Sequence, residues 1–453
     1  MTVKDKMFLV VGTGKSGIAA TELLLAHEAR VILYDSNEKL DIVGLCRKNP
    51  ALRGLEIVAG EFPESCVDGL DAAVLSPGVP CDLPLVEHLR QEGVAIWGEI
   101  ELAYRLGKGR IAAITGTNGK TTTTSLVGEI MKGYFPDVKV VGNIGIPYTQ
   151  VVDETTDDTV IAAEISSFQL ETIDQFAPKV SAILNITPDL LNRHHTMECY
   201  IETKESIVKN QTSEDVCVLN YDDPALRSFG ETLPLTVVYF SSTQTLEEGL
   251  YLSGEEIVWT KDGKETTYVN VNDLNILGRH NYENAMAAIA ICASMGVSRH
   301  AIVKGLCNFE AVEHRIEYVC EKRGVRFYND SKGTNPDAAI KGISAMNRPT
   351  VLIGGGYDKE SSYDEWIESF GEKVKKLVLL GQTREKIAAC ARAHDFTEIA
   401  FADSLEEAVE LSYQAAEPGD AVLLSPACAS WGMFENYEQR GRMFKEYVRN
   451  LKE

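Results

Sequence analysis

The chain has 453 residues, of which 44% are hydrophobic and 25% are charged, a composition typical of soluble globular proteins. A single core does not grow to this length, so we expect two or three domains. The formal net charge of −23 repels nucleic acid and anionic membrane surfaces, which argues against both as partners. An anionic substrate would need local basic residues or a metal ion to overcome this field.

Ten cysteines are scattered along the chain, and none of them forms a C-x-x-C pair. They are predicted to be reduced, mostly buried thiols of a cytoplasmic protein. The apolar stretch Met7–Val11 runs directly into glycines, which argues against a secretory signal. No apolar run approaches the roughly 18 residues that a spanning helix needs, so no membrane insertion is expected.

The N-terminal segment begins with a predicted strand, Met7–Gly12, and continues with a glycine-rich loop and a helix to about His27. A second strand, Val31–Tyr34, ends at Asp35. The loop Gly12–Gly17 is a complete G-x-G-x-x-G, and the acid follows the next strand. Taken alone this pattern suggests a dinucleotide site, but the same geometry serves any diphosphate.

A further strand of this segment is predicted at Ala72–Leu75, and it ends in the turn Ser76-Pro77-Gly78. The segment closes near Trp97. We therefore expect a first domain that covers residues 1–98.

The most informative stretch of the chain is IAAITGTNGKTT, residues 111–122. An apolar strand ends in a glycine-punctuated turn, after which Lys120 opens a helix. The glycines let backbone N–H groups approach phosphate oxygens, and the helix N-terminus adds partial positive charge. Lys120 is predicted to reach the β- and γ-phosphates of a nucleotide, and the Thr121 hydroxyl to ligate Mg²⁺. The usual signature G-x-x-x-x-G-K-[ST] has a glycine at the position of Ile114. This departure narrows the range of nucleotide-binding families to which the loop can belong.

The central segment continues with strands predicted at Thr159–Ile165, Val180–Asn185 and Val216–Asn220. The stretch Val237–Val271 alternates polar and apolar residues between glycine turns, which predicts hairpins and a small antiparallel patch. An alanine-rich helix, Asn281–Ser294, closes this second domain, which is expected to cover residues 99–311.

A third domain is expected to start around His314-Arg315 and to cover residues 312–453. Strands alternate with helices here, and they are predicted at Arg326–Tyr328, Thr350–Ile353, Lys376–Leu380 and Ala421–Leu424. This alternation predicts a parallel sheet with helices on its faces. The predicted fold class is therefore α/β with three domains: Rossmann-like N-terminal and C-terminal domains and a central P-loop-type ATPase domain.

Three polar residues of the central domain are candidates for metal binding, substrate binding or catalysis. Glu164 ends a predicted strand, where a carboxylate can hold the Mg²⁺ that bridges phosphates; the alternative is a solvated turn glutamate. Asn143 follows another strand and either binds substrate or caps a turn. Lys204 lies in the helical stretch Tyr200–Val208, where a lysine is more often a surface residue.

The third domain offers comparable loops after its strands, the edge where ligands bind to such sheets. Asp330-Ser331-Lys332 provides an acid for a ribose and a lysine for a phosphate. Arg315 lies at a domain junction, where a cation could meet a γ-phosphate. Lys359 follows a glycine turn, and Ser425–Ser430 is a loop of small residues.

Together and in this order, these motifs resemble the Mur ligases of peptidoglycan precursor synthesis. TGTNGKTT (Thr115–Thr122) is similar to the ATP loop of the family. Other segments recur as in its glutamate-adding type, namely GNIG, EISSFQL, LNITPD, GRHNYENA, EHRIE, NDSKGTN and LLSPACASWGMFENYEQRG. The resemblance covers essentially the whole chain, and it implies one domain for a UDP substrate, one for ATP, and a C-terminal domain that closes over both.

The resemblance implies an ATP-dependent ligase that adds D-glutamate to UDP-N-acetylmuramoyl-L-alanine (UDP-MurNAc-L-Ala) through an acyl phosphate. ATP and Mg²⁺, with two metal sites, would be required, and we expect a cytoplasmic monomer. Three alternatives remain: another Mur-type ligase or folylpolyglutamate-synthetase relative, a catalytically impaired binder of UDP-muramyl precursors, and a pyridine-nucleotide oxidoreductase. The phosphate loop has no role in the last of these.

The residues of the family's sites carry over to matching positions. The catalytic residues would be Lys120, Lys204, Arg315 and Lys332. ATP would be bound by Gly116, Thr117, Asn118, Gly119, Lys120, Thr121, Thr122, Asn281, Asn284, Arg315 and Asp330. The other substrates would be bound by Ser16, Asp35, Ser36, Ser76, Pro77, Gly78, Asn143, Ser166, Gln169, Arg193, Thr334, Lys359, Ser430 and Tyr437.

The metal ligands implied by the resemblance are Thr121, Glu164 and Lys204, the last as a carbamylated lysine. Carbamylation needs a neutral amine, so the site is expected to depress the pKa of this lysine. One departure concerns the second metal, because Leu190 stands where the family usually has a histidine, and leucine cannot ligate a metal. An aspartate is also common at Asn192. His194, His195 or a water are the candidate replacements.

Overall fold

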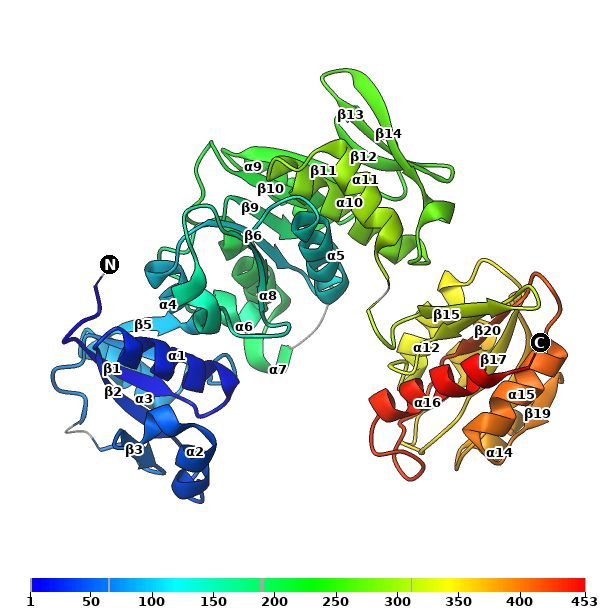
Figure 1. Cartoon of the computed structure of the whole chain (residues 1–453), viewed down its shortest axis with the longest axis horizontal. Coiled ribbons are helices and arrows are strands. Elements are labelled where there is room, and N and C mark those ends of the chain that lie inside the picture. Colours follow the sequence, from blue (N-terminus) through cyan, green and yellow to red (C-terminus); the bar gives the residue numbers. More distant parts are fainter. Residues whose placement is uncertain (1, 64–65, 188–190, 311, 453) are drawn as a thin grey trace. The chain divides into compact units, whose positions relative to one another are not determined.

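The structure is a computed structural model, and it describes residues 2–63, 66–187, 191–310 and 312–452. The chain divides into two compact units, Met1–Val269 with Glu283–Gly305, and Asn270–Tyr282 with Leu306–Glu453. The first unit contains a five-stranded and a nine-stranded sheet, and the second contains a six-stranded sheet (Figure 1). Among the described residues, every helix is too short or too polar to cross a bilayer.

The N-terminal domain is a parallel sheet in the order β3-β2-β1-β4-β5 with helices on both faces. Phe8 and Val10 pack with helix α1 on one face, whereas Leu9 and Val11 pack with α3 on the other. A ligand can therefore approach this sheet only at its ends. The elements are β1 (Met7–Val11), α1 (Lys15–Ala26), β2 (Arg30–Asp35), α2 (Ile42–Lys48), β3 (Glu56–Ala59), β4 (Ala72–Leu75), α3 (Pro84–Gln91), β5 (Ala95–Gly98) and α4 (Glu99–Leu106).

The central domain is built on the sheet β14-β13-β12-β11-β10-β9-β6-β8-β7. Its strands are β6 (Arg110–Thr115), β7 (Val138–Gly142), β8 (Val160–Glu164), β9 (Val180–Ile183), β10 (Val216–Asn220), β11 (Thr236–Ser241), β12 (Gly249–Ser253), β13 (Glu256–Lys261) and β14 (Lys264–Asn270). Its helices are α5 (Lys120–Lys132), α6 (Ser167–Leu170), α7 (Leu191–His194), α8 (Met197–Glu205), α9 (Pro224–Thr232), α10 (Arg279–Ser294) and α11 (Arg299–Asn308). Strand β6 pairs in parallel with β8 and β9, so the ends of these three strands meet at one edge.

The antiparallel patch predicted for Val237–Val271 is wrong in part. Strand β11 pairs in parallel with β10, and β12 pairs in parallel with β11, so the segment extends the main sheet. Antiparallel pairing begins only with the hairpin β12–β13. Strand alternation predicts that a strand has one polar face, but it does not predict the direction of the neighbouring strand.

The C-terminal domain is a sheet in the order β15-β16-β20-β17-β18-β19, parallel except at the antiparallel edge pair β15–β16. Val351 and Ile353 of β17 pack with α15 and α16, whereas Leu352 packs with α12, α13 and α14. Its elements are β15 (Glu317–Lys322), β16 (Val325–Asn329), α12 (Pro336–Ala345), β17 (Thr350–Gly354), α13 (Asp364–Glu368), β18 (Val374–Leu379), α14 (Arg384–Ala393), β19 (Ile399–Phe401), α15 (Leu405–Ala415), β20 (Ala421–Leu424) and α16 (Tyr437–Asn450).

The predicted three-domain α/β fold is confirmed, and each strand predicted for the third domain has a counterpart within two residues. The sequence pattern missed β3, β5, β15 and β19, whereas β7 is the strand expected before Asn143. The missed strands are short or partly exposed, so their apolar runs are interrupted. The boundaries at residues 98 and 311 stay a prediction.

Candidate active site

The phosphate-binding loop joins β6 to α5, and two of its residues require glycine. Gly119, the residue before α5, has φ +85°, and a Cβ here would lie 2.4 Å from Asn284 Oδ1. Gly116 has φ +145°, with the backbone nitrogen of Leu184 3.2 Å from its Cβ position. The Asn284 Oδ1 atom also accepts a hydrogen bond from the Thr123 hydroxyl at 3.2 Å. Asn284, predicted to bind ATP, therefore packs directly on this loop.

The loop after β9 braces the phosphate-binding loop. Asn185 Oδ1 accepts a 2.8 Å hydrogen bond from the Asn118 N–H, and Asn185 Nδ2 donates to the Asn118 carbonyl at 3.1 Å. The Thr117 hydroxyl lies 3.0 Å from the Tyr200 hydroxyl and accepts from the Thr187 N–H at 3.0 Å. Asn185 belongs to the LNITPD motif, but no local pattern indicates this role, because the partner of Asn185 is distant in sequence.

Two lysines converge on the loop backbone. Lys120 Nζ donates to the carbonyls of Gly116 and Thr117 at 2.8 and 2.9 Å, and Lys204 Nζ donates to the same Gly116 carbonyl at 2.9 Å. Lys204 is only 1% exposed and lies over the ring of Tyr200. The Lys120 ammonium and the backbone N–H groups of the loop make it a favourable site for a polyanion. The expectation that a lysine in this helix lies on the surface does not hold here.

Glu164 provides a feature that a cation site requires, which is a buried carboxylate oxygen without a hydrogen-bond partner among the described residues. Its Oε1 atom accepts a 2.7 Å hydrogen bond from Asn143 Nδ2, whereas its buried Oε2 atom has no hydrogen-bond partner among the described residues. The residue is 1% exposed, and Ile114 beside it on β6 leads directly into the phosphate loop. A buried carboxylate oxygen without a partner is costly unless a cation or donor reaches it. The Glu164 carboxylate therefore fits Mg²⁺ as a ligand. The half-buried Thr121 hydroxyl can provide a further oxygen ligand.

The two histidines proposed to replace Leu190 have different environments. His194 is buried, with Nε2 2.9 Å from the Ser167 hydroxyl and its ring 5.1 Å from that of Tyr200. Burial lowers the pKa of His194 and outweighs the opposing charge of Glu171, whose Oε1 atom lies 3.5 Å from Nδ1, so the neutral form is favoured. His195 is exposed and faces Asp82. Of the two, His194 is the better candidate for a ligand; Leu190 itself lies outside the described residues.

Ser166 and Gln169, predicted to contact substrate, form a capping box at the start of α6. The Ser166 Oγ accepts from the Gln169 N–H at 3.3 Å, and Gln169 Oε1 accepts from the Ser166 N–H at 2.9 Å. Arg193 donates to Glu171 Oε2 at 2.6 Å and to the carbonyl of Val79 in the N-terminal domain at 2.9 Å. These contacts hold the residues that follow β8 in defined positions beside Glu164.

In the N-terminal domain, Asp35 holds the glycine-rich loop Gly12–Gly17 in place through hydrogen bonds. Asp35 Oδ2 accepts from the N–H and the hydroxyl of Thr13 at 3.0 and 2.6 Å. Burial opposes ionisation of Asp35, but these hydrogen bonds and one from the Asn37 N–H hold its pKa below the usual value. Gly17 packs so closely that a Cβ would lie 1.9 Å from the Gly12 carbonyl oxygen.

The Ser76 hydroxyl is buried at the end of β4 without a hydrogen-bond partner among the described residues. It lies next to the glycine loop, 2.7 Å from the Cβ position of Gly12. The other predicted contacts on this edge have partly or fully exposed side chains, and they are Ser16, Ser36, Pro77 and Gly78. This edge can therefore receive a polar ligand.

In the second unit, the loop after β16 is organised around two buried charged groups. Asp330 accepts from the Ser425 hydroxyl at 2.7 Å, and burial raises its pKa to about 7. Arg440 donates to the Ser331 carbonyl and hydroxyl at 2.8 and 2.9 Å and to the Cys428 carbonyl at 3.2 Å. Burial lowers the pKa of Arg440 to about 10, so it remains charged at neutral pH. Arg440 joins both predicted substrate loops, and sequence reasoning assigned it no role.

Of the remaining predicted residues of this unit, Lys332, Thr334, Lys359 and Ser430 lie on loops after strands, whereas Asn281 lies in α10 and Tyr437 opens α16. Lys332 lies over the ring of Tyr437, and Lys359 over that of Trp431. Asn281 donates to the Leu277 carbonyl at 2.7 Å. Side-chain exposure is high for Arg315, intermediate for Thr334 and low for Ser430.

This fold and these loops define a class of nucleotide-dependent three-domain enzymes, and comparison with known proteins identifies the family. Residues 6–98 match the MurD-like N-terminal domain of Mur ligases, residues 114–292 the Mur ligase middle domain, and residues 314–428 the Mur ligase glutamate ligase domain. The chain belongs to the Mur ligase family.

Curated relatives match over the whole of both chains. The chain is 56% identical to the UDP-N-acetylmuramoylalanine–D-glutamate ligase of Lachnoclostridium phytofermentans, and 54% and 47% identical to the enzymes of that name from Lachnospira eligens and Clostridioides difficile.

Among solved structures, the UDP-N-acetylmuramate-alanine ligase of Thermotoga maritima is 20% identical with a TM-score of 0.59, covering 99% of this chain and 100% of that one. The MurF ligase of the same organism, in complex with ADP, is 18% identical with a TM-score of 0.55, covering 99% and 96%. These two structures support the fold.

Proposed function

We propose that the chain is an ATP-dependent amide ligase that adds D-glutamate to UDP-MurNAc-L-Ala, a step of peptidoglycan precursor synthesis. The observation that carries the proposal is the full-length match, at 56% identity, to a D-glutamate ligase. The loop on which Lys120 and Lys204 converge supports the use of ATP. Activation is needed because a carboxylate does not condense with an amine in water.

In the first step, the alanyl carboxylate attacks the γ-phosphorus of ATP, the bond to the β-phosphate oxygen breaks, and an acyl phosphate and ADP form. Backbone N–H groups of the loop Gly116–Gly119 hold the phosphates, and the Lys120 ammonium offsets the charge that develops on the transferring group. Arg315 adds a second cation, and Asn281, Asn284 and Asp330 hold the nucleoside. Catalysis here is mostly positioning and charge neutralisation.

In the second step, the amine of D-glutamate attacks the acyl carbon, loses a proton, and the tetrahedral adduct expels phosphate. Lys332 faces the reacting carboxylate, and the glutamate is held by Thr334, Lys359, Ser430 and Tyr437. Closure of the C-terminal domain excludes water, which would otherwise hydrolyse the acyl phosphate. Arg440 acts indirectly, because it fixes both loops that carry these residues.

Mg²⁺ would be held by Thr121 and Glu164, and a second ion by carbamylated Lys204 with His194. The ions supply additional positive charge at the phosphates. The Glu164 Oε2 atom, which has no hydrogen-bond partner within the described ranges, supports the first site, and the burial of His194 beside Lys204 supports the second.

The UDP end of the substrate binds at the N-terminal domain, through Ser16, Asp35, Ser36 and the turn Ser76–Gly78. Asn143, Ser166, Gln169 and Arg193 guide the muramoyl-alanine arm toward the phosphate loop. We place the enzyme in the cytoplasm, where ATP is available and where ten unpaired cysteines remain reduced. The monomeric state stays a prediction for size-exclusion chromatography with light scattering.

Phosphate release by the purified protein tests this function directly. Release should require ATP, UDP-MurNAc-L-Ala and D-glutamate together, and mass spectrometry should find one amide product. L-lysine or diaminopimelate in place of D-glutamate is the matched control. Release with either of these, and none with D-glutamate, would reassign the chain within the family. Tight binding of the UDP substrate without product would instead favour an inactive binder.

A further inference from the structure

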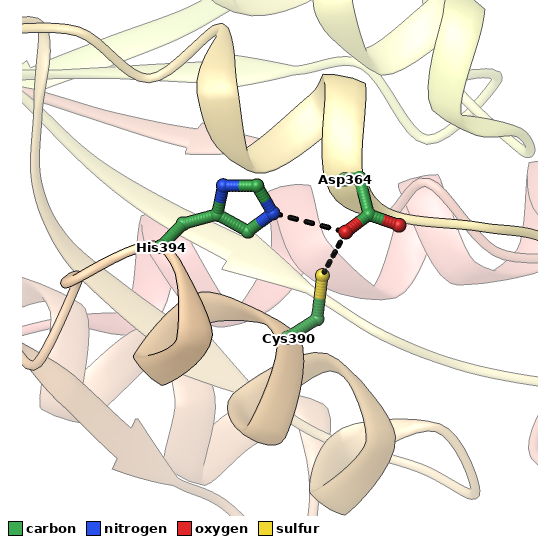
Figure 2. Close-up of side chains that lie close together, drawn as sticks. All are labelled: Asp364, Cys390 and His394. Carbon is green, nitrogen blue, oxygen red and sulfur yellow. Dashed lines mark hydrogen bonds and ion pairs between the residues drawn. The ribbon is translucent and has the colours of Figure 1, made fainter.

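A cluster of metal-ligating side chains lies in the C-terminal domain, and none of its members has a role in the proposed ligase reaction. Asp364 opens α13, Cys390 lies in α14, and His394 is the residue that caps the end of α14 (Figure 2). One ligand atom from each side chain lies within 4.8 Å of the other two. Across the described ranges of the chain, this is the one group of three or more such side chains.

The two distances from Asp364 lie on either side of those in a tetrahedral metal site. Asp364 Oδ1 is 2.9 Å from His394 Nε2 and 3.7 Å from Cys390 Sγ. With zinc–oxygen and zinc–nitrogen bonds of about 2.0–2.1 Å and a zinc–sulfur bond of about 2.3 Å, ligand atoms lie about 3.3–3.6 Å apart. Cys390 and His394 are four positions apart, a spacing that brings side chains to one face of a helix end. Both distances from Asp364 are therefore within a few tenths of an ångström of those that an ion requires, and the remaining pair, Cys390 and His394, lies within 4.8 Å.

A hydrogen bond orients Asp364, and a second carboxylate lies near the distal nitrogen of His394. Asp364 Oδ2 accepts a 2.6 Å hydrogen bond from the Ser362 hydroxyl, so the opposite oxygen, Oδ1, faces His394 and Cys390 (Figure 2). Glu368 Oε1 lies 3.7 Å from His394 Nδ1. A carboxylate behind the distal nitrogen of a histidine is the usual support for a metal ligand, because it favours the tautomer with a free Nε2 lone pair.

We propose that Asp364, Cys390 and His394 bind a divalent transition-metal ion, preferentially Zn²⁺, with water as the fourth ligand. A thiolate with an imidazole selects zinc over magnesium, and the carboxylate completes a common donor set. On binding, the Cys390 S–H bond and the His394 Nε2–H bond to Asp364 break, both protons pass to solvent, and sulfur–metal and nitrogen–metal bonds form. The ion would tie α13 to the end of α14, in addition to the hydrophobic packing of these helices and the ion pair of Asp364 with His394.

Cobalt titration of the metal-free full chain, without nucleotide or magnesium, tests the site. A tetrahedral thiolate site gives a sulfur-to-cobalt charge-transfer band and intense visible bands, which should saturate at one equivalent and disappear on addition of Zn²⁺. Cys390→Ser should remove the charge-transfer band. Cys320→Ser is the matched control, since Cys320 is a half-buried thiol of the same domain outside the cluster, and it should retain the band.

Zinc affinity provides a second measurement. His394→Gln should weaken binding by at least about 100-fold, and Glu368→Gln by about 10-fold, since supporting carboxylates contribute less than ligands. Cys390→Ser should keep D-glutamate-dependent phosphate release, which shows that the variant is folded; if it does not fold, His394→Gln provides the test. Equal zinc affinity of the wild-type chain and the ligand variants, or cobalt saturation without a charge-transfer band, would overturn the proposal.

Discussion

This chain has two glycine-rich loops, one after β1 and one after β6, and each joins a strand to a helix. The side chains that hydrogen-bond to the two loops differ in charge. In the first loop, Asp35 accepts hydrogen bonds from Thr13 at 2.6 and 3.0 Å. In the second, the Gly116 carbonyl accepts from Lys120 and Lys204 at 2.8 and 2.9 Å. The glycines set the shape of each loop, whereas the bracing residues set the charge that it presents.

This difference separates two kinds of phosphate binding. An acid-braced loop can bind a nucleotide through N–H groups and hydroxyls, and it offers no cation to a transferring phosphoryl group. A loop that carries the Lys120 ammonium is suited to the build-up of negative charge during phosphoryl transfer. We therefore expect the first loop to determine substrate affinity and stability, and the second to determine the rate.

The largest effect is expected for Lys120→Ala in the second loop. Loss of this cation should lower kcat/KM by about 1,000-fold while the protein remains folded, because the charge on the transferring group is no longer offset. Phosphate release and circular dichroism measure the two effects. The control is Lys132→Ala at the exposed end of the same helix, which should change the rate by less than about twofold. Unchanged activity of Lys120→Ala would remove the loop from the mechanism.

Gly17→Ala should disturb the first loop through its shape. The added Cβ would lie 1.9 Å from a backbone oxygen that cannot move aside alone, so we expect a loss of about 1–3 kcal/mol in the free energy of unfolding. Gly14→Ser is the control, since no atom lies within 4 Å of its Cβ position and serine is a favourable residue before a helix. Urea denaturation compares the two variants. Equal stabilities would show that the close approach of Gly17 to Gly12 is unimportant.

Ser76→Ala should separate substrate binding from stability. Its hydroxyl is buried and unpartnered among the described residues, so its removal should change the unfolding free energy by less than about 0.5 kcal/mol. If the hydroxyl binds the charged diphosphate, KM for UDP-MurNAc-L-Ala should rise about tenfold. KM for ATP is the internal control and should not change. An equal rise in both constants would contradict the assignment of the first loop to the UDP substrate.

The smallest effect, about 1 kcal/mol of stability, is expected for Asp35→Asn, which replaces charge-assisted hydrogen bonds with neutral ones. The pKa of Asp35 is lower in the folded state than its ordinary value near 4, so the ionised carboxylate stabilises the fold above that pH. This contribution is lost as the pH falls through the folded-state pKa. The difference between wild type and variant should therefore be largest at neutral pH and shrink below about pH 4. A pH-independent difference in urea midpoints would argue against this brace.

Much of the site could be predicted from local patterns. Gly116 and Gly119 lie where the strand–loop–helix pattern requires positive φ, and Glu164 lies at the end of its strand as expected. Arg440 and Asn185 were not recognised, since each acts through backbone groups of segments far along the chain. An arginine in a surface-type helix pattern gives no local sign that it is buried.

By itself, the sequence determined the α/β class, the position of the phosphate loop and most strand positions, because glycines, apolar runs and helix starts act over a few residues. The tertiary structure decided which side chains meet. Lys204 reaches Gly116 across 88 positions only because β9 and β8 flank β6 in the sheet. Likewise, Asp364 meets His394 because α13 and α14 pack on the same face of the C-terminal sheet. Such contacts between distant residues depend on strand order and helix packing, which local sequence patterns do not encode.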